Sequence, residues 1–173
     1  MTRITAVRGD LTAEVVDAIV NAANSSLLGG GGVDGAIHRA AGPRLLEACR
    51  ELRRTAYPDG LPTGYAVVTP GFDLPARFVI HTVGPNRHAG QTDSALLASC
   101  FRESLRIARE AGARSIAFPA VSAGVYGWAA GEVARIAVET VRAETSEEDS
   151  IGLVRFVLFS DALLAAFEAA LAT

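Results

Sequence analysis

The chain has 173 residues, of which half are hydrophobic and a fifth are charged, and its formal net charge is −3. This composition suits one globular domain over residues 1–173, and the charge excludes the broad basic surface that sequence-independent nucleic-acid binding requires. No apolar run reaches the ~18 residues that span a membrane, and the polar start leads into no secretory signal. We expect a cytoplasmic protein, and a monomer.

The cysteines and histidines form no recognisable cofactor site. Cys49 and Cys100 fall in segments that we expect to be helical, where they act as small buried hydrophobes. Two cysteines make no disulfide framework, and with the three histidines they show neither Cys-x-x-Cys nor His-x-x-x-His spacing. The sequence therefore predicts no metal.

Strand-like and helical segments alternate along the chain. Short apolar runs predict strands at Ile4–Val7, Ala18–Ala22, Tyr65–Thr69, Phe78–Thr82, Ser115–Pro119 and Val154–Phe159. Helical patterns fill Gly35–Ala41, Pro43–Arg54, Ser94–Ala111, Gly131–Glu144 and Ala162–Ala172. Such alternation indicates an α/β fold with a largely parallel sheet and helices on both of its faces.

The segment Ile19–Gly42 carries most of the functional signal. A buried strand leads into Asn21 and Asn24, which we expect at or just past its carboxyl end, where open α/β sheets place ligand sites. Four consecutive glycines, Gly29–Gly32, permit φ > 0 and let backbone N–H groups approach an anion. Asp34 then precedes the first short helix, so a glycine loop feeds a helix N-terminus, which is a typical phosphate site.

A purely structural interpretation exists for each of these residues. Asp34 would be an N-cap, the glycines a flexible loop, and the asparagines partners of turn backbone. Four glycines in a row argue against it for the whole segment, because they lower stability unless backbone must approach something. No Gly-Lys-Ser/Thr follows, so the segment is not a Walker loop.

A second glycine-bearing loop, Ala120–Trp128, lies between the strand that ends at Pro119 and the Gly131–Glu144 helix. Two loops of this kind can hold a diphosphate from opposite sides through backbone donors. Tyr126 and Trp128 offer flat surfaces to a sugar or a base. We assign Tyr126 to the ligand and Trp128 to the core.

With both loops in place, the sequence resembles a macrodomain, and within that family the MacroD-like ADP-ribose hydrolases. The matching strings are Gly9–Thr12, Val20–Asn24, Gly29–Gly42, Val79–Pro85 and Ser122–Gly127. They follow the family's order, and VNAAN and GGGGVDGAIHRAAG are the most specific of them. The resemblance implies a three-layer α/β/α sandwich with a six-stranded mixed sheet and an ADP-ribose cleft at one edge.

The resemblance also implies residue roles. Asn24 would hold the distal ribose and Asp34 would lie near its anomeric carbon, which makes these two residues the catalytic candidates. Asp10 would accept a hydrogen bond from the adenine amino group near Leu11, with helix capping as its structural alternative, and Phe159 would contact adenine unless it is a core residue. Further substrate contacts, mainly backbone contacts to the diphosphate, are implied for Asn21, Gly31, Gly32, Val33, Ser122, Ala123, Gly124, Val125 and Tyr126.

Two positions depart from the family pattern. Ala123 stands where many relatives have threonine or serine, which removes a side-chain contact to phosphate. Ala129 stands where proline is common, which predicts a less rigid second loop. Neither change removes a proposed catalytic group.

Cleavage at the anomeric carbon passes through an oxocarbenium-like state, so it needs a positioned water, a base and a fixed sugar. We assign Asp34 as the base and Asn24 as the residue that orients the ribose. A helix N-terminus lowers the pKa of an aspartate, whereas a nearby diphosphate raises it. In an alternative mechanism the substrate phosphate positions the water, and Asp34 stabilises positive charge on the sugar.

The predicted function is a cofactor-independent hydrolase that removes mono-ADP-ribose from modified protein or nucleic acid. The linkage remains open among aspartate or glutamate esters, O-acetyl-ADP-ribose and nucleic-acid adducts; an ester is the default because its carboxylate leaves without protonation. The main alternative is a reader module that binds ADP-ribose without turnover, although a reader has no chemical reason to pair Asn24 with Asp34. A phosphoesterase would need a metal-binding carboxylate cluster that the sequence lacks.

Overall fold

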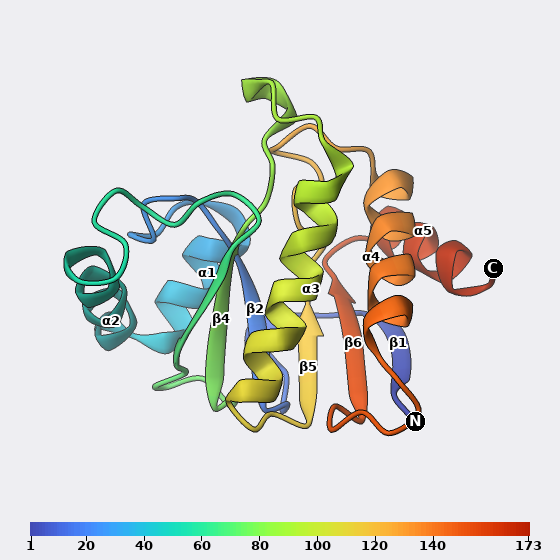
Figure 1. The fold of residues 1–173 in the computed structure, drawn as a ribbon, viewed down its shortest axis with the longest axis horizontal. Coiled ribbons are helices and arrows are strands. Elements are labelled where there is room, and N and C mark those ends of the chain that lie inside the picture. Colours follow the sequence, from blue (N-terminus) through green and yellow to red (C-terminus); the bar gives the residue numbers. More distant parts are fainter.

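A six-stranded mixed sheet forms the middle layer of the computed structural model, which describes residues 1–173 (Figure 1). The strands are β1 (Arg3–Arg8), β2 (Ala18–Ala23), β3 (Ala66–Pro70), β4 (Phe78–Val83), β5 (Ser115–Phe118) and β6 (Leu153–Leu158). Their order is β1-β6-β5-β2-β4-β3, and β3 alone runs antiparallel to its neighbour. Every predicted strand is confirmed to within one residue at each end.

Helices cover both faces of the sheet, which confirms the predicted α/β/α sandwich. The helices are α1 (Gly32–Ala41), α2 (Pro43–Arg54), α3 (Ser94–Glu110), α4 (Ala130–Glu144) and α5 (Asp161–Leu171), with short 3-10 helices η1 (Leu11–Ala13) and η2 (Arg87–Ala89). Helices α1 and α2 pack on one face, and α3, α4 and α5 pack on the other. None of these helices is both long and apolar enough to cross a lipid bilayer.

Four of the five predicted helices match the structure to within one residue at each end. The boundary between α1 and α2 follows from two residues: Gly42 adopts φ = 86° and ends α1, and Pro43 begins α2 at a position where no N–H donor is needed. The prediction for α1 was wrong at its start, because the helix begins at Gly32, three residues before Gly35.

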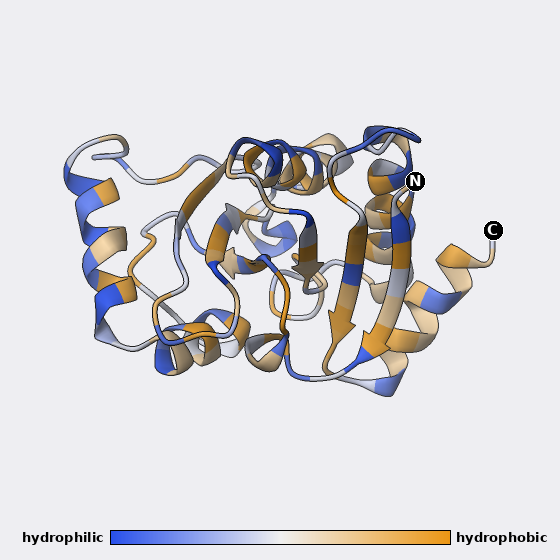
Figure 2. Cartoon of the chain, turned by 90° about the horizontal axis from the view of Figure 1, so that it is seen from below, coloured by the Kyte–Doolittle hydropathy of each residue, from blue (hydrophilic) through white to orange (hydrophobic).

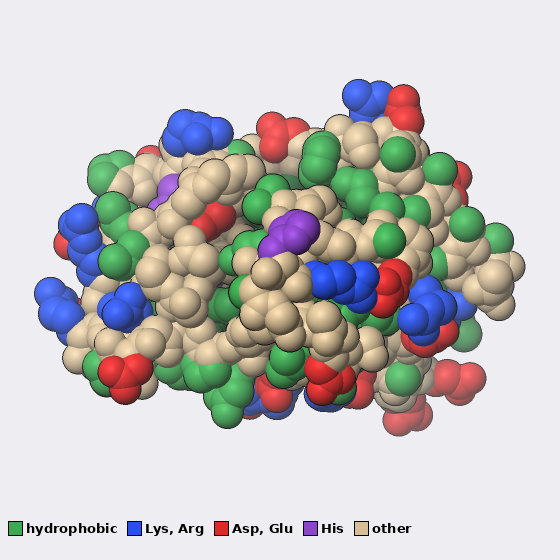
Figure 3. Space-filling view, turned by 90° about the horizontal axis from the view of Figure 1, so that it is seen from above, with side chains coloured by type: hydrophobic (Ala, Val, Ile, Leu, Met, Phe, Trp, Pro, Cys, Tyr) green, Lys and Arg blue, Asp and Glu red, His purple; other side chains and the backbone are tan.

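The parallel strands all end at one edge of the sheet. In Figure 1 the arrows of β5 and β6 point upward, and in Figure 2 the strands are largely hydrophobic while helices such as α2 alternate between hydrophobic and hydrophilic residues. Figure 3 looks down on the edge where the strands end, and much of it is tan backbone and small polar side chains rather than charge. We call this side the carboxyl edge.

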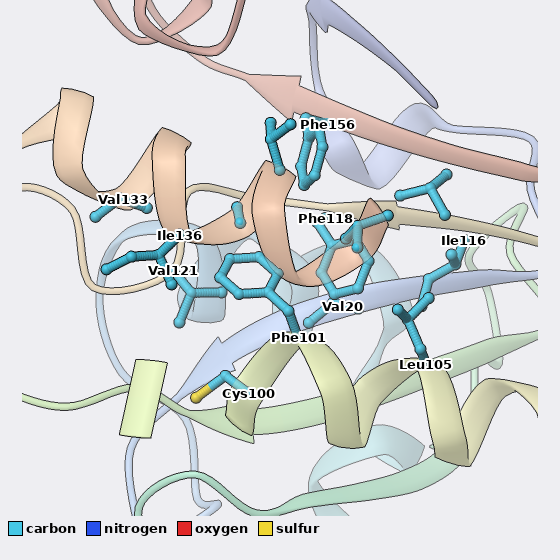
Figure 4. Packing of buried hydrophobic residues seen from close by; sticks show 14 of the residues in the cluster. Val20, Cys100, Phe101, Leu105, Ile116, Phe118, Val121, Val133, Ile136 and Phe156 are labelled. Carbon is cyan, nitrogen blue, oxygen red and sulfur yellow. The ribbon is translucent and has the colours of Figure 1, made fainter. Parts of the chain in front are cut away.

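Successive side chains of each strand point to opposite faces of the sheet, so the molecule has two separate hydrophobic cores. Between the sheet and α3–α5 lie 26 buried residues, among them Phe101, Phe118 and Phe156, whose ring centroids lie 5.2–6.4 Å apart (Figure 4). A core of 17 buried residues lies between the sheet and α1–α2. Cys49 belongs to the smaller core and Cys100 to the larger, so their predicted burial in helices is confirmed.

Candidate functional site

The predicted site residues follow the carboxyl ends of four neighbouring strands. Asp10 follows β1, Phe159 follows β6, the second loop follows β5, and Asn24 follows β2. Because these strands are adjacent and parallel, all four groups lie along the carboxyl edge. Three strand spacings of ~4.8 Å give about 14 Å, which suits an elongated ligand with distinct groups at its two ends.

The glycine loop runs directly into α1. Gly31 is the N-cap and makes no side-chain hydrogen bond, while Asp34 lies inside the first turn, so the interpretation of Asp34 as the N-cap was wrong. Gly31 and Gly32 are exposed, and a Cβ atom added to either would meet no atom within 4 Å. The unpaired N–H groups of the first helical turn therefore adjoin open space, where an anion can approach them.

Asp34 is held in place by its neighbours beneath the loop. Its side chain is buried, Asn21 Nδ2 donates to Oδ1 over 2.8 Å, and His38 Nε2 lies 3.4 Å from the same oxygen. Burial raises the pKa of Asp34, and this effect outweighs the hydrogen bond from Asn21 and the charge of His38, which both lower that pKa. The net shift is therefore opposite to the lowering expected from the helix N-terminus, and Asp34 is a stronger base than an exposed aspartate.

Asn24 ties the glycine loop together. Its Nδ2 donates to the Gly29 carbonyl over 3.1 Å, and its Oδ1 accepts from the Ser26 backbone N–H and hydroxyl. The structural interpretation of this asparagine is thus realised, although one N–H of Nδ2 remains. A Cβ atom on Gly30 would lie 3.2 Å from both Asn24 Nδ2 and Asp34 Oδ2. The two catalytic candidates therefore lie close to the same point of the loop.

Asn21 does not lie where the sequence placed it. It is inside β2 rather than at its end, and it is fully buried. Its amide contacts Asp34 and, over 3.1 Å, His81 Nδ1, instead of reaching the ligand side of the loop. The predicted position of Asn21 is thus corrected to one beneath Asp34.

Sequence reasoning missed His81 and Thr69. His81 on β4 is fully buried, and its Nε2 lies 3.0 Å from the hydroxyl of Thr69 on β3. Burial lowers the pKa of His81 to about 3, so this imidazole is neutral near pH 7. The available signal was a histidine inside a strand that is apolar except for Thr82, since a buried histidine needs a polar partner.

The second loop presents backbone to the carboxyl edge. Ser122 adopts φ = 68°, and its buried hydroxyl donates to the Pro85 carbonyl over 2.9 Å, so that side chain is already occupied. Gly124 has φ = 76°, and an added Cβ would meet nothing within 4 Å. Neighbouring Ala123 is half-buried and Val125 is exposed, so open space lies beside this loop as it does beside the first.

Contacts from η2 brace the second loop. The backbone N–H of Arg87 donates to the Tyr126 carbonyl over 2.8 Å, and its guanidinium lies 4.0 Å from the centre of the Trp128 ring while bonding both carboxylate oxygens of Glu132. Trp128 is 2% exposed, which confirms its assignment to the core. Tyr126 is half-buried. These contacts tie the second loop to η2 and to α4.

Asp10 and Phe159 lie on neighbouring strand ends at the far part of the edge. Asp10 Oδ1 accepts from the Thr12 N–H and hydroxyl over 2.9 and 2.7 Å, so the capping alternative is realised for η1. Leu11 belongs to the smaller core. Phe159 is 79% exposed, so the alternative that it is a core residue was wrong. Its ring is free to cover a flat group.

Comparison with known proteins assigns the family. The Macro domain family model matches residues 20–137. A macro domain-containing protein of Streptomyces griseus is 63% identical over 166 residues, which cover 96% of this chain and 93% of the relative. An O-acetyl-ADP-ribose deacetylase of Escherichia fergusonii is 56% identical over 140 residues, which cover 80% of this chain and 78% of the relative.

Solved structures agree. The macrodomain of Oceanobacillus iheyensis with ADP matches with a TM-score of 0.90 and 47% identity, over 96% of this chain and 88% of that one. The Trypanosoma brucei macrodomain in complex with ADP-ribose matches with a TM-score of 0.88 and 41% identity, over 97% of this chain and 68% of that one. The chain belongs to the macrodomain family, as its resemblance implied.

Proposed function

We propose that this macrodomain binds ADP-ribose along the carboxyl edge and hydrolyses mono-ADP-ribosyl esters. The observation that carries the proposal is the placement of Asn24 Nδ2 and Asp34 Oδ2, both 3.2 Å from the Cβ position of Gly30, beside a helix N-terminus with open backbone. The Trypanosoma brucei relative in complex with ADP-ribose and the relative named as an O-acetyl-ADP-ribose deacetylase support the ligand and the class of reaction.

The ligand would lie along the strand ends in the order of its chemical groups. Adenine would take the end near Asp10 and Phe159, where an exposed ring and a carboxylate adjoin. The diphosphate would lie between the two loops, whose Gly32 and Gly124 face open space. The distal ribose would then reach Asn24 and its linked group would point to solvent.

The reaction would use Asp34 as a base. Asp34 Oδ2 takes a proton from water, the water oxygen bonds to the anomeric carbon, and the bond from that carbon to the acyl oxygen breaks. The carboxylate of the target leaves with the electron pair and needs no proton, so no general acid is required. The raised pKa of Asp34 favours this role, because it brings the proton acceptor closer to the working pH.

Release of ADP-ribose tests the function directly. The protein is incubated with substrates carrying one ADP-ribose on a glutamate ester, on an acetyl ester or on nucleic acid, and free ADP-ribose is measured by chromatography. We expect release from the esters first. Binding of ADP-ribose with no release from any substrate would make the protein a reader module.

Asp34→Ala separates catalysis from binding. We expect turnover to fall by ~10² or more, the usual scale for a positioned acid–base group. ADP-ribose affinity measured by calorimetry should stay within about tenfold, because it depends mainly on backbone donors. Asp59→Ala removes an exposed carboxylate outside the loops and serves as the control. Full hydrolysis by Asp34→Ala would instead assign water activation to the substrate phosphate.

A further inference from the structure

A row of buried polar side chains crosses three strands beneath Asp34. Thr69 on β3, His81 on β4 and Asn21 on β2 lie on the sheet face that packs against α1 and α2. Asn21 and His81 are fully buried and Thr69 is 4% exposed. The successive distances from Thr69 Oγ1 to His81 Nε2, from His81 Nδ1 to Asn21 Nδ2, and from Asn21 Nδ2 to Asp34 Oδ1 are 3.0, 3.1 and 2.8 Å.

The carboxylate fixes the direction of every hydrogen bond in this row. An ionised Asp34 only accepts, so the Asn21 atom that faces it is the amide nitrogen. The same nitrogen faces His81 Nδ1, which must therefore be the bare, accepting nitrogen of a neutral ring. The ring proton is then on Nε2, where the Thr69 hydroxyl oxygen lies 3.0 Å away and Cys49 Sγ lies 3.9 Å away.

The orientation of the Asn21 amide leaves its oxygen without a hydrogen-bond partner, yet the opposite orientation would be less favourable. Nδ2 makes both hydrogen bonds, while the buried Oδ1 has no partner. Turning the amide over would place Oδ1 against the ionised carboxylate of Asp34, which is worse than leaving one acceptor unpaired. Asp34 thus holds the amide in one orientation, and that orientation sets the tautomer of His81.

We infer that the Thr69–His81–Asn21 row is a positioning device that holds Asp34 Oδ1 by a fixed donor and so directs Oδ2 to the glycine loop. His81 acts through Asn21 and touches no ligand, so it is a positioning residue. The inference deepens the proposed function and rests on it for its catalytic part. Its structural part, the fixed tautomer and the hydrogen bond to Asp34, stands apart from any reaction.

Other ionisable groups lie near Asp34 and bear on how its pKa is interpreted. They are His38 one turn along α1, Cys49 on α2 and His81 itself on β4. Burial raises the pKa of the Cys49 thiol to about 12, so Cys49 and His81 both stay uncharged near neutral pH. The charge of His38 lowers the pKa of Asp34.

Three substitutions of His81 separate positioning from mere packing. The amide of His81→Asn lies where Nδ1 lies and keeps an acceptor for Asn21, whereas the longer His81→Gln places its amide near the position of Nε2. His81→Phe keeps a ring and loses both polar atoms. Melting temperature, ADP-ribose affinity, turnover and the carbon-13 titration of the Asp34 carboxyl are measured for each, and nitrogen-15 NMR gives the His81 tautomer in the unaltered protein.

We expect a neutral His81 with its proton on Nε2 from about pH 5 to pH 8. His81→Phe and His81→Gln should lower turnover about tenfold, the effect of losing one hydrogen bond to a charged group, with unchanged ADP-ribose affinity. Both should also raise the pKa of Asp34, because the Asn21 bond that lowers it is lost. His81→Asn should retain most of the turnover even where it melts lower.

Two results would overturn the inference: a proton on His81 Nδ1, or a His81→Phe protein with the Asp34 titration and turnover of the unaltered chain. A chain that releases no ADP-ribose from any substrate would defeat the proposed function instead. The tautomer and the carboxyl titration would then still decide whether the row holds Asp34.

Discussion

The two faces of the sheet are built for different purposes. The face under α3–α5 holds the larger core, in which Phe156 packs against Phe101 and Phe118 (Figure 4) and also against Phe167. The face under α1–α2 holds a smaller core that is interrupted by buried Asn21, Asp34, Thr69 and His81. Burying polar groups lowers stability unless they are hydrogen-bonded. The face under α3–α5 therefore has the larger apolar core, and the face under α1–α2 gives up part of its apolar packing to buried polar side chains.

From this difference between the two faces we expect substitutions on them to have different effects. Changes in the larger core should lower the free energy of unfolding and leave the site of the folded protein intact. Changes beside the polar row should alter ligand binding or turnover with smaller effects on stability. Three substitutions test this expectation, from the largest effect to the smallest.

Phe156→Ala should have the largest effect. The ring is fully buried among three other phenylalanines, so its removal should cost about 3–5 kcal/mol of unfolding free energy. Urea unfolding measures the loss, and calorimetry at low temperature measures ADP-ribose affinity of the folded protein, which we expect to stay within about twofold. Phe72→Ala, which removes a half-buried ring near α2, should cost less. A large loss of affinity in folded Phe156→Ala would show that the faces are coupled.

Gly32→Val should have an intermediate effect on stability and a strong one on binding. Gly32 has φ = 57°, so valine is strained there by about 1–3 kcal/mol, and its side chain would fill the open space beside the loop. Gly112→Val is a matched control, since Gly112 has φ = 79° and equally open surroundings at the far end of α3. Thermal melting should drop in both, whereas ADP-ribose affinity should fall at least tenfold in Gly32→Val alone. Equal affinities would show that the glycine loop is structural.

The sequence predicted the elements well because their signals are local. Gly42 and Pro43 mark the boundary of two helices within two residues, and each strand is a short apolar run. The start of α1 escaped prediction because Gly31 and Gly32 are poor helix formers whose conformation depends on the surrounding fold. At the start of α1, tertiary structure outweighs the low helix propensity of glycine.

The site was predictable only in part. Asn24 and Asp34 lie in one motif, and the structure brings them together at Gly30. The link between Asn21 and His81 needs the pairing register of β2 with β4, which joins residues far apart in the chain. Whether Phe159 points to core or solvent also depends on register. The pKa of Asp34 was predicted in the wrong direction, because its burial follows from packing that no local pattern reports.

Asp34→Asn should have the smallest effect on the free energy of unfolding. Whether the variant is more or less stable than the unaltered protein should depend on pH. Burial raises the pKa of Asp34, so the folded protein holds this proton to a higher pH than the unfolded chain does. Stability therefore falls as pH rises from the unfolded value of about 3.9 through the raised folded value, and then stays level. The amide oxygen of Asp34→Asn still accepts from Asn21, yet it carries no charge.

The variant should therefore melt higher than the unaltered protein at neutral pH, by roughly 2–4 °C if the gain is ~1 kcal/mol. The gain should shrink as pH falls and vanish once Asp34 is protonated in both states. Asp59→Asn, at an exposed position, should show no such gain. If Asp34→Asn instead melts lower at neutral pH, the donor from Asn21 more than offsets desolvation of the charge. The face under α1–α2 would then stabilise the fold through the same carboxylate that the proposed reaction needs. The two faces would differ less in their contribution to stability than the sizes of their cores suggest.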